Sequence, residues 1–280
     1  MWLGPYRRLA VAVSLSPRRE ALLAEAGYLA EQMGAELVVI HVGRPSEHTY
    51  AHLEALMERQ HLDGPGCKLY FPSGPPAKAI ARICQEEAVD LLVLGALPTQ
   101  STKDAVFGTV AQDTLRLVNC SVLLLADPRQ RPKPWQEVAL ATNTLQAEGM
   151  LIEKTVRMAQ ALGADHVHLL VKDGQGADDL PVITRRRQAA SSGLAHARHA
   201  LDPFEGDTLE EDENRPPDLH IKLFAGALSR ACLQFMEKHP VEVLALEAPP
   251  SAAMGYFWRW RYLYLSKLVA QLPTNLLLVR

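Results

Sequence analysis

Two stretches of this chain repeat the same order of structural signals, and this internal repeat restricts the fold more than any other feature. In the first half, a short apolar run that begins at Arg8 precedes a helical pattern, a stop at Gly34 and a second apolar run over 37–42. The second half repeats this order 129 residues later, around Gly163. Because glycine after a helix supplies a left-handed C-cap, the two halves share structural signals and not merely composition.

A second block recurs with an offset of 152 residues. Gly74 and Gly226 each precede a helical pattern and then an apolar strand, and this offset aligns Gly95 with Glu247 without a gap. The two offsets differ by 23 residues, which places an insertion in the second half between about residues 172 and 220. The insertion includes an acidic run flanked by prolines, a composition typical of an exposed loop.

Nearly continuous runs of Val, Leu and Ile that alternate with helical patterns indicate a parallel sheet covered on both faces. We therefore predict an α/β fold with two tandem domains, residues 1–130 and 131–280. Such sheets bind ligands at the carboxyl ends of their strands, where the strand order reverses. In the first half this directs attention to the loops at 14–17, 42–45 and 95–109.

The composition excludes several classes of protein. A hydrophobic share of 48% and a charged share of 22% are ordinary for a globular chain, and a net charge of −3 gives no basic excess for nucleic acid. The longest apolar run, 91–97, is too short to span a membrane, and the first seventeen residues lack the layout of a signal peptide. The four cysteines form neither a disulfide framework nor a metal motif. We expect a soluble, cytoplasmic protein without a bound metal.

The repeated segments resemble the universal stress protein family in its tandem form. The resemblance rests on the order and spacing of residues 9–17, 34–42, 74–80, 90–95, 108–110 and 120–125, and the second half matches in pattern more than in motif. It implies two adenine nucleotide alpha hydrolase-like, Rossmann-type domains, each with a mostly parallel five-stranded sheet flanked by helices. It also implies a stress-response or regulatory protein that acts by binding and is not an enzyme.

Members of that family that bind ATP carry an Asp after the first strand and a Gly-x2-Gly-x9-Gly-Ser/Thr loop for the phosphates. Here Ser14 replaces the Asp, and Pro98, which has no N–H, replaces the second glycine. In the second half Thr142 and Glu247 replace the Asp and the first glycine, and a carboxylate would repel phosphates. We expect weak or no binding of ATP or another adenine nucleotide in the first half and none in the second. The candidate nucleotide-binding residues are Ser14, Val42, Gly95, Pro98, Gly108, Thr109 and Val110.

An aromatic and basic segment, 254–265, occupies the place of the phosphate loop in the second half. One side of it continues a helical apolar stripe, but Trp, Tyr and Arg are also the residues that dominate protein–protein contacts. A basic aromatic helix can also lie on a membrane surface, which we favour less than a contact with a protein partner or a second copy. The candidate contact residues are Trp258, Arg259, Trp260, Arg261 and Tyr264.

Three functional hypotheses follow. The first, which we favour, is a regulatory protein that works through protein contacts, because four ligand-binding positions of the family pattern are replaced. The second is an ATP-dependent switch that uses the loop from Gly95 to Thr109, with slow hydrolysis left open. The third is a soluble regulatory subunit that docks on a membrane transporter through residues 257–264.

Overall fold

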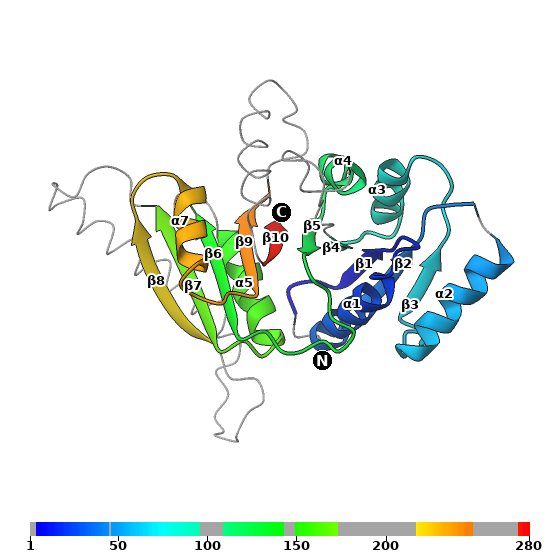
Figure 1. The fold of residues 1–280 in the computed structure, drawn as a ribbon, viewed down its shortest axis with the longest axis horizontal. Helices are drawn as coiled ribbons and strands as arrows, with labels where there is room; N and C mark the ends of the chain where they lie inside the picture. The colour runs from blue at the N-terminus through cyan, green and yellow to red at the C-terminus, as the bar shows by residue number, and fades with distance from the viewer. Residues whose placement is uncertain (1–3, 45, 96–108, 143–148, 173–216, 249–273) are drawn as a thin grey trace, which may run out of the picture. The chain divides into compact units, whose positions relative to one another are not determined.

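The computed structural model of the chain describes residues 4–44, 46–95, 109–142, 149–172, 217–248 and 274–280. These residues belong to two compact units (Figure 1). One unit extends to Lys133, and the other extends from Pro134 to Ala248 and includes the last strand. The division falls three residues after the expected boundary at 130.

The first unit is a parallel sheet with the strand order β3-β2-β1-β4-β5. All five residues of β5 and the first four of β4 are buried. Since successive residues of a strand point to opposite faces, both faces of the sheet are covered, as the apolar runs predict. The elements are β1 (Arg8–Ala12), α1 (Arg19–Met33), β2 (Glu36–Ile40), α2 (Glu47–Arg59), β3 (Cys67–Tyr70), α3 (Pro76–Glu86), β4 (Leu91–Gly95), α4 (Thr109–Leu117) and β5 (Ser121–Leu125).

The second unit repeats this arrangement, with the strand order β8-β7-β6-β9-β10 and all pairs parallel. The predicted α/β fold with a five-stranded parallel sheet in each half is confirmed (Figure 1). The elements described are β6 (Glu137–Thr142), α5 (Gly149–Ala161), β7 (His166–Lys172), β8 (Asp218–Phe224), α7 (Leu228–Met236), β9 (Val243–Glu247) and β10 (Asn275–Val279).

The repeat extends to the way the helices end. Gly34 follows α1 with a φ of 63°, and Gly163 follows α5 with a φ of 68°. In each case the next backbone N–H donates to a carbonyl in the last turn of the helix, at 2.8 Å from Ala35 and 2.9 Å from Ala164. Glycine adopts this left-handed conformation without a steric cost, so the two glycines identified in the sequence are the helix C-caps.

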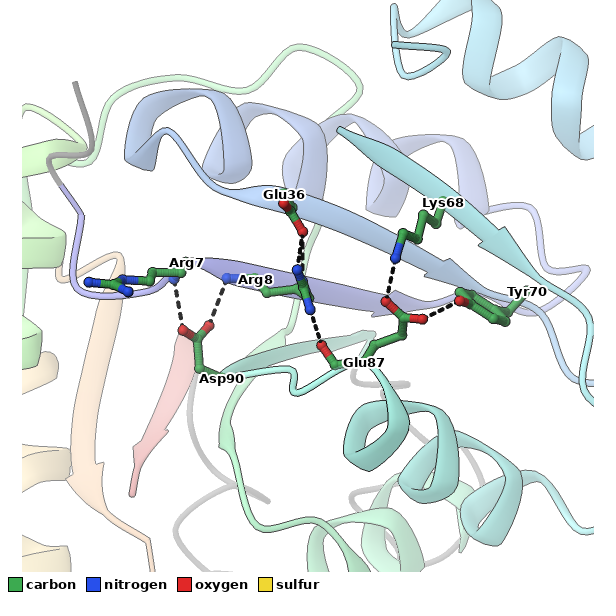
Figure 2. A network of polar contacts seen from close by, with 7 residues as sticks. All are labelled: Arg7, Arg8, Glu36, Lys68, Tyr70, Glu87 and Asp90. Atoms are coloured by element: carbon green, nitrogen blue, oxygen red, sulfur yellow. Dashed lines mark hydrogen bonds and ion pairs between the residues drawn. The ribbon is translucent and has the colours of Figure 1, made fainter. Parts of the chain in front are cut away.

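A carboxylate holds the first strand of each unit through the same pair of hydrogen bonds. Asp90 accepts from the backbone N–H groups of Arg7 (2.8 Å) and Arg8 (3.1 Å), as Figure 2 shows. Glu242, which lies 152 residues after Asp90, accepts from two consecutive backbone N–H groups at the start of β6, at 2.9 and 2.8 Å. The sequence offset therefore aligns two residues with the same structural role.

Further polar contacts connect the strands around Arg8 (Figure 2). Its guanidinium donates to the Glu36 carboxylate (2.7 Å) and to the backbone carbonyl of Glu87 (2.6 Å). Lys68 (2.8 Å) and the Tyr70 hydroxyl donate to the Glu87 carboxylate, and these hydrogen bonds lower the pKa of Glu87. The network ties β1, β2 and β3 to the end of α3.

We expect Asp90→Asn to lower the free energy of unfolding by about 1–2 kcal/mol, because the amide offers one acceptor oxygen and turns its NH₂ group toward a backbone donor. Glu242→Gln should have a similar effect in the second unit. Urea unfolding measures both. Asp113→Asn is the control, since Asp113 forms an exposed i,i+3 ion pair with Arg116 and should change stability by less than about 0.5 kcal/mol. An Asp90→Asn variant as stable as the control would contradict the assignment.

No sequence pattern predicted α2, β3 or β8. Both strands lie at sheet edges and mix polar with apolar residues, so they lack the continuous apolar run of a central strand. β8 begins at Asp218, so the insertion ends slightly before the expected limit of about residue 220. The acidic run at 202–216 lies outside the described residues. No helix in the described parts of the chain is long and apolar enough to cross a membrane.

Candidate ligand-binding cavity in the first unit

The first unit contains a cavity of about 670 Å³ at the carboxyl ends of β1, β2 and β4. Its wall includes the ends of these strands and the residues that follow, 12–16, 40–44 and 94–95. In the sheet, β1 lies between β2 and β4, so the order of the strands reverses at β1. This is the position at which parallel α/β sheets bind ligands.

Several of the predicted nucleotide-binding residues converge on this cavity. Ser14, Val42, Gly95 and Val110 all line it, although they come from four separate segments of the chain. Thr109 is the first residue of α4. Pro98 and Gly108 lie outside the described residues. The structure thus places four of the seven on one wall, and their contact with a ligand stays a prediction.

The polar part of the wall includes two arginines. Arg18, Arg44 and His41 line the cavity, and none of the described lining residues is an Asp or a Glu. The Arg18 guanidinium is held by the carbonyl of Ala126 (2.7 Å) and by the exposed carboxylate of Asp127 (2.9 Å). Basic groups without a competing carboxylate in the wall favour an anionic ligand.

Three helices begin at this cavity. Arg18 is the N-cap of α1, Pro76 is the first residue of α3, and Val110 and Ala111 lie in the first turn of α4; all four residues line the wall. The amino end of a helix carries a partial positive charge and backbone N–H groups without helical partners. The helix ends therefore add to the attraction that Arg18 and Arg44 exert on an anion.

Most of the remaining wall is apolar. Leu22, Ile40, Ile80 and Leu94 line the cavity and are themselves almost completely buried in the unit. Leu15 also lines it, with 56% of its surface exposed, so it marks the open side. Apolar walls with a few polar groups are typical of small-molecule sites, and flat apolar surfaces suit an aromatic ring.

His41 is the buried polar group of the wall. Its Nδ1 lies 2.9 Å from the backbone carbonyl of Val13, and since a carbonyl only accepts, Nδ1 carries the proton. When the ring is neutral, the acceptor lone pair is therefore on Nε2. The edge of the ring also packs against Phe71, with the ring centroids 5.5 Å apart. His41 is thereby held in one orientation at the carboxyl end of β2.

Arg18, His41 and Arg44 are not among the predicted site residues, although Arg44 lies in the loop at 42–45 that the predicted fold indicates. The available signal was their position, because each follows an apolar strand closely, in loops that the predicted fold brings to the carboxyl edge of the sheet. Because these three residues are separated in the chain, they do not form a recognisable sequence motif. Only the parallel pairing of β1 with β2 makes them neighbours.

The corresponding position in the second unit has different chemistry. Thr142 ends β6 and is buried, with 1% of its surface exposed. Glu247, which aligns with Gly95, ends β9 with an exposed side chain. A carboxylate at this point opposes an anion, so the two units are not equivalent as binding sites.

The predicted partner-contact residues Trp258, Arg259, Trp260, Arg261 and Tyr264 lie outside the described residues, and their role stays a prediction. Within the described ranges, no group of three or more His, Cys, Asp or Glu side chains is arranged to hold a metal ion.

Comparisons with known proteins agree with this fold. Residues 50–126 match the model of the Universal stress protein family. The chain is 23% identical over 146 residues to Universal stress protein YxiE of Bacillus subtilis (strain 168), which covers 43% of this chain and 99% of the relative. A putative universal stress protein from Pseudomonas aeruginosa UCBPP-PA14 aligns with 98% of this chain and 93% of its own at 16% identity, with a TM-score of 0.69.

A universal stress protein from Archaeoglobus fulgidus DSM 4304 aligns over 100% of this chain and 97% of its own at 13% identity, with a TM-score of 0.64. At these identities the solved structures show a shared fold, and they show it over both units. The match to the family model covers residues 50–126, so over this part of the first unit the chain is similar to the universal stress protein family.

Proposed function

We propose that this stress-response protein acts by binding a small anionic ligand in the cavity of its first unit, and that an adenine nucleotide is the ligand class that fits best. The cavity carries the proposal. Its volume of about 670 Å³ is within the range of small-molecule sites, roughly 300–1,000 Å³. Its apolar wall suits a base, and its cationic groups and helix ends suit phosphate.

The proposed affinity is low. Ser14 offers a hydroxyl where the family pattern has a carboxylate, and Pro98 removes a backbone donor from the loop. Each loss costs about 1–3 kcal/mol of binding free energy, so we expect a Kd between about 10 μM and about 1 mM. Binding at this level suits a cytoplasmic sensor of an abundant metabolite and requires no catalytic step.

The proposal predicts one nucleotide per chain. Isothermal titration with Mg-ATP, ADP and AMP should give a stoichiometry of one, since Glu247 disfavours an anion at the matching position of the second unit. The same nucleotides should raise the thermal midpoint, because a ligand that binds only the folded state stabilises it. Absence of binding for all three would contradict the proposal and favour action through protein contacts.

We expect Arg44→Ala to weaken nucleotide binding about tenfold, because it removes a cation from the cavity wall. Arg82→Ala is the matched control. Arg82 lies on α3 in an exposed ion pair with Glu86 and is not among the cavity residues. Equal affinities in the two variants would show that the ligand does not contact the wall at Arg44.

A further inference from the structure

Four histidines of the second unit gather in one place, and none of them belongs to the cavity. His166 and His168 lie on β7, His220 lies on the neighbouring β8, and His239 follows α7. The ring centroid of His168 is 5.0 Å from that of His220, 5.5 Å from that of His239 and 6.4 Å from that of His166. We refer to these four residues as the imidazole cluster.

Topology brings the imidazole cluster together. His166 and His168 are two positions apart on β7 and so point to the same face of the sheet. His220 is paired with His168 in the parallel register of β7 and β8, although 52 residues separate them in the chain. α7 packs on β6 and β7, and the His239 ring stacks on Phe235 of this helix at 4.3 Å between centroids.

Two contacts in the cluster require neutral rings. The Lys222 ammonium lies 2.9 Å from Nε2 of His239, and since an ammonium only donates, this nitrogen must carry a lone pair. Nε2 of His220 lies 3.2 Å from Nδ1 of His166, so one of these two nitrogens donates and the other accepts. A second proton on His239, or on the accepting ring of the other pair, removes the hydrogen bond and replaces it with repulsion.

The most buried ring also resists a second proton. Nε2 of His168 lies 2.5 Å from the Glu137 carboxylate, which only accepts, so Nε2 carries the proton. Its Nδ1 is buried and has no hydrogen-bond partner among the described residues. A second proton would therefore be buried at Nδ1 without an acceptor, which costs free energy.

Charged groups of both signs lie around the imidazole cluster. β6 contributes Glu137, which contacts His168, and β8 contributes Asp218, which is 3.9 Å from His166. On the other side, β8 also contributes Lys222, whose ammonium lies 4.6 Å from the Phe235 ring centroid. The last turn of α7 is followed by the exposed Glu237 and Lys238. Two carboxylates thus face four imidazoles and an ammonium.

Burial lowers the pKa of His168 and His239 below the ordinary value of 6.5, and Lys222 lowers both further. The hydrogen bond that His168 donates to Glu137 raises the pKa of His168 without reversing the shift. The unfolded chain therefore binds more protons than the folded chain as pH falls below 6.5. The stability from these neutral rings is complete above that pH and is lost as pH falls through the lowered pKa values.

We propose that the imidazole cluster is an acid-responsive element, which loosens β8 and α7 from the rest of the second unit when the pH falls below about 6.5. The two elements are held to β7 and to each other partly by contacts that depend on neutral rings. β8 is also the edge strand of the described sheet, so it has only one neighbouring strand to retain it. The element acts independently of the cavity in the first unit.

Hydrogen exchange of the full chain between about pH 7.5 and pH 5 tests the proposal. After correction for the intrinsic rate, we expect amides of β8 and α7 to exchange about tenfold faster at the acidic limit, while amides of β1 and β4 change little. The triple variant His166→Gln/His220→Gln/His239→Gln retains polar side chains that do not titrate. It should lose most of this pH dependence.

His48→Gln/His52→Gln is the matched control, because these two histidines stack on each other on α2 in the first unit, 6.5 Å apart. It should retain the acid response of β8 and α7. A triple variant that responds to acid like the wild type would overturn the proposal. If that variant does not fold at neutral pH, an NMR titration of the wild-type protein gives the pKa of each histidine. A pKa at or above 6.5 for His168 and His239 would overturn the proposal, and a pKa below 6.5 for both would support it.

Discussion

Replacing Gly95 by glutamate should greatly weaken nucleotide binding in the first unit without disturbing the fold. Gly95 lines the cavity at the end of β4, and Glu247 is its counterpart at the end of β9. A Cβ added to Gly95 would lie 3.6 Å from Leu22 Cδ2, which is an ordinary contact. The new carboxylate would face an anionic ligand at short range, so we expect a loss of affinity on the order of 100-fold.

Two variants at the same position separate charge from volume. Gly95→Ala should retain most of the affinity, and Gly95→Gln, which matches glutamate in size, should lie between the two. Isothermal titration gives the affinities, and circular dichroism checks that the fold is unchanged. A Gly95→Glu variant with wild-type affinity would place the ligand elsewhere and would remove the proposed reason why the second unit differs.

The largest loss of stability is expected from Leu92→Ala and, in the second unit, from Leu244→Ala. The two residues are 152 positions apart and occupy the second position of β4 and of β9, and neither exposes any surface. Truncation of a buried leucine removes apolar contacts and leaves a cavity, so each variant should lose about 2–5 kcal/mol of unfolding free energy.

Urea unfolding measures both losses, and Leu117→Ala provides the comparison. Leu117 ends α4 with 41% of its surface exposed, so its truncation should cost less than about 1 kcal/mol. If Leu244→Ala lost as little unfolding free energy as Leu117→Ala, the core of the second unit would be less tightly packed than the burial of its strands indicates.

The two predictions concern the ligand site and the core, and the two units differ at the first of these but agree in the second. The elements that hold each sheet together are retained in both units, as the helix-capping Gly34 and Gly163 and the carboxylates of Asp90 and Glu242 show. The residue at the carboxyl end of the fourth strand is not retained, since glycine in the first unit is glutamate in the second. The two units thus share one architecture but differ in the residue that would face an anionic ligand in the proposed site.

The strands at the sheet edges are harder to predict from sequence patterns than the central strands. A central strand such as β4 has a continuous apolar run because both faces of the sheet are covered, and it was predicted correctly. β3 and β8 alternate polar with apolar residues because each lies at the described edge of its sheet. They lack the continuous apolar run by which the other strands were predicted, and their pairing with β2 and β7 identifies them as strands.

The sequence by itself determined the two-fold repeat, the alternation of strands and helices, the glycine stops and the edge of the sheet where a ligand site belongs. These properties depend on local periodicity and on residues at fixed spacing, which a linear sequence records. The tertiary structure alone decided that Arg18, His41 and Arg44 share a cavity wall and that His168, His220 and His239 form a cluster. The physical reason is that parallel strands are joined by long crossovers, so residues that meet at one end or one face of the sheet are far apart in the chain.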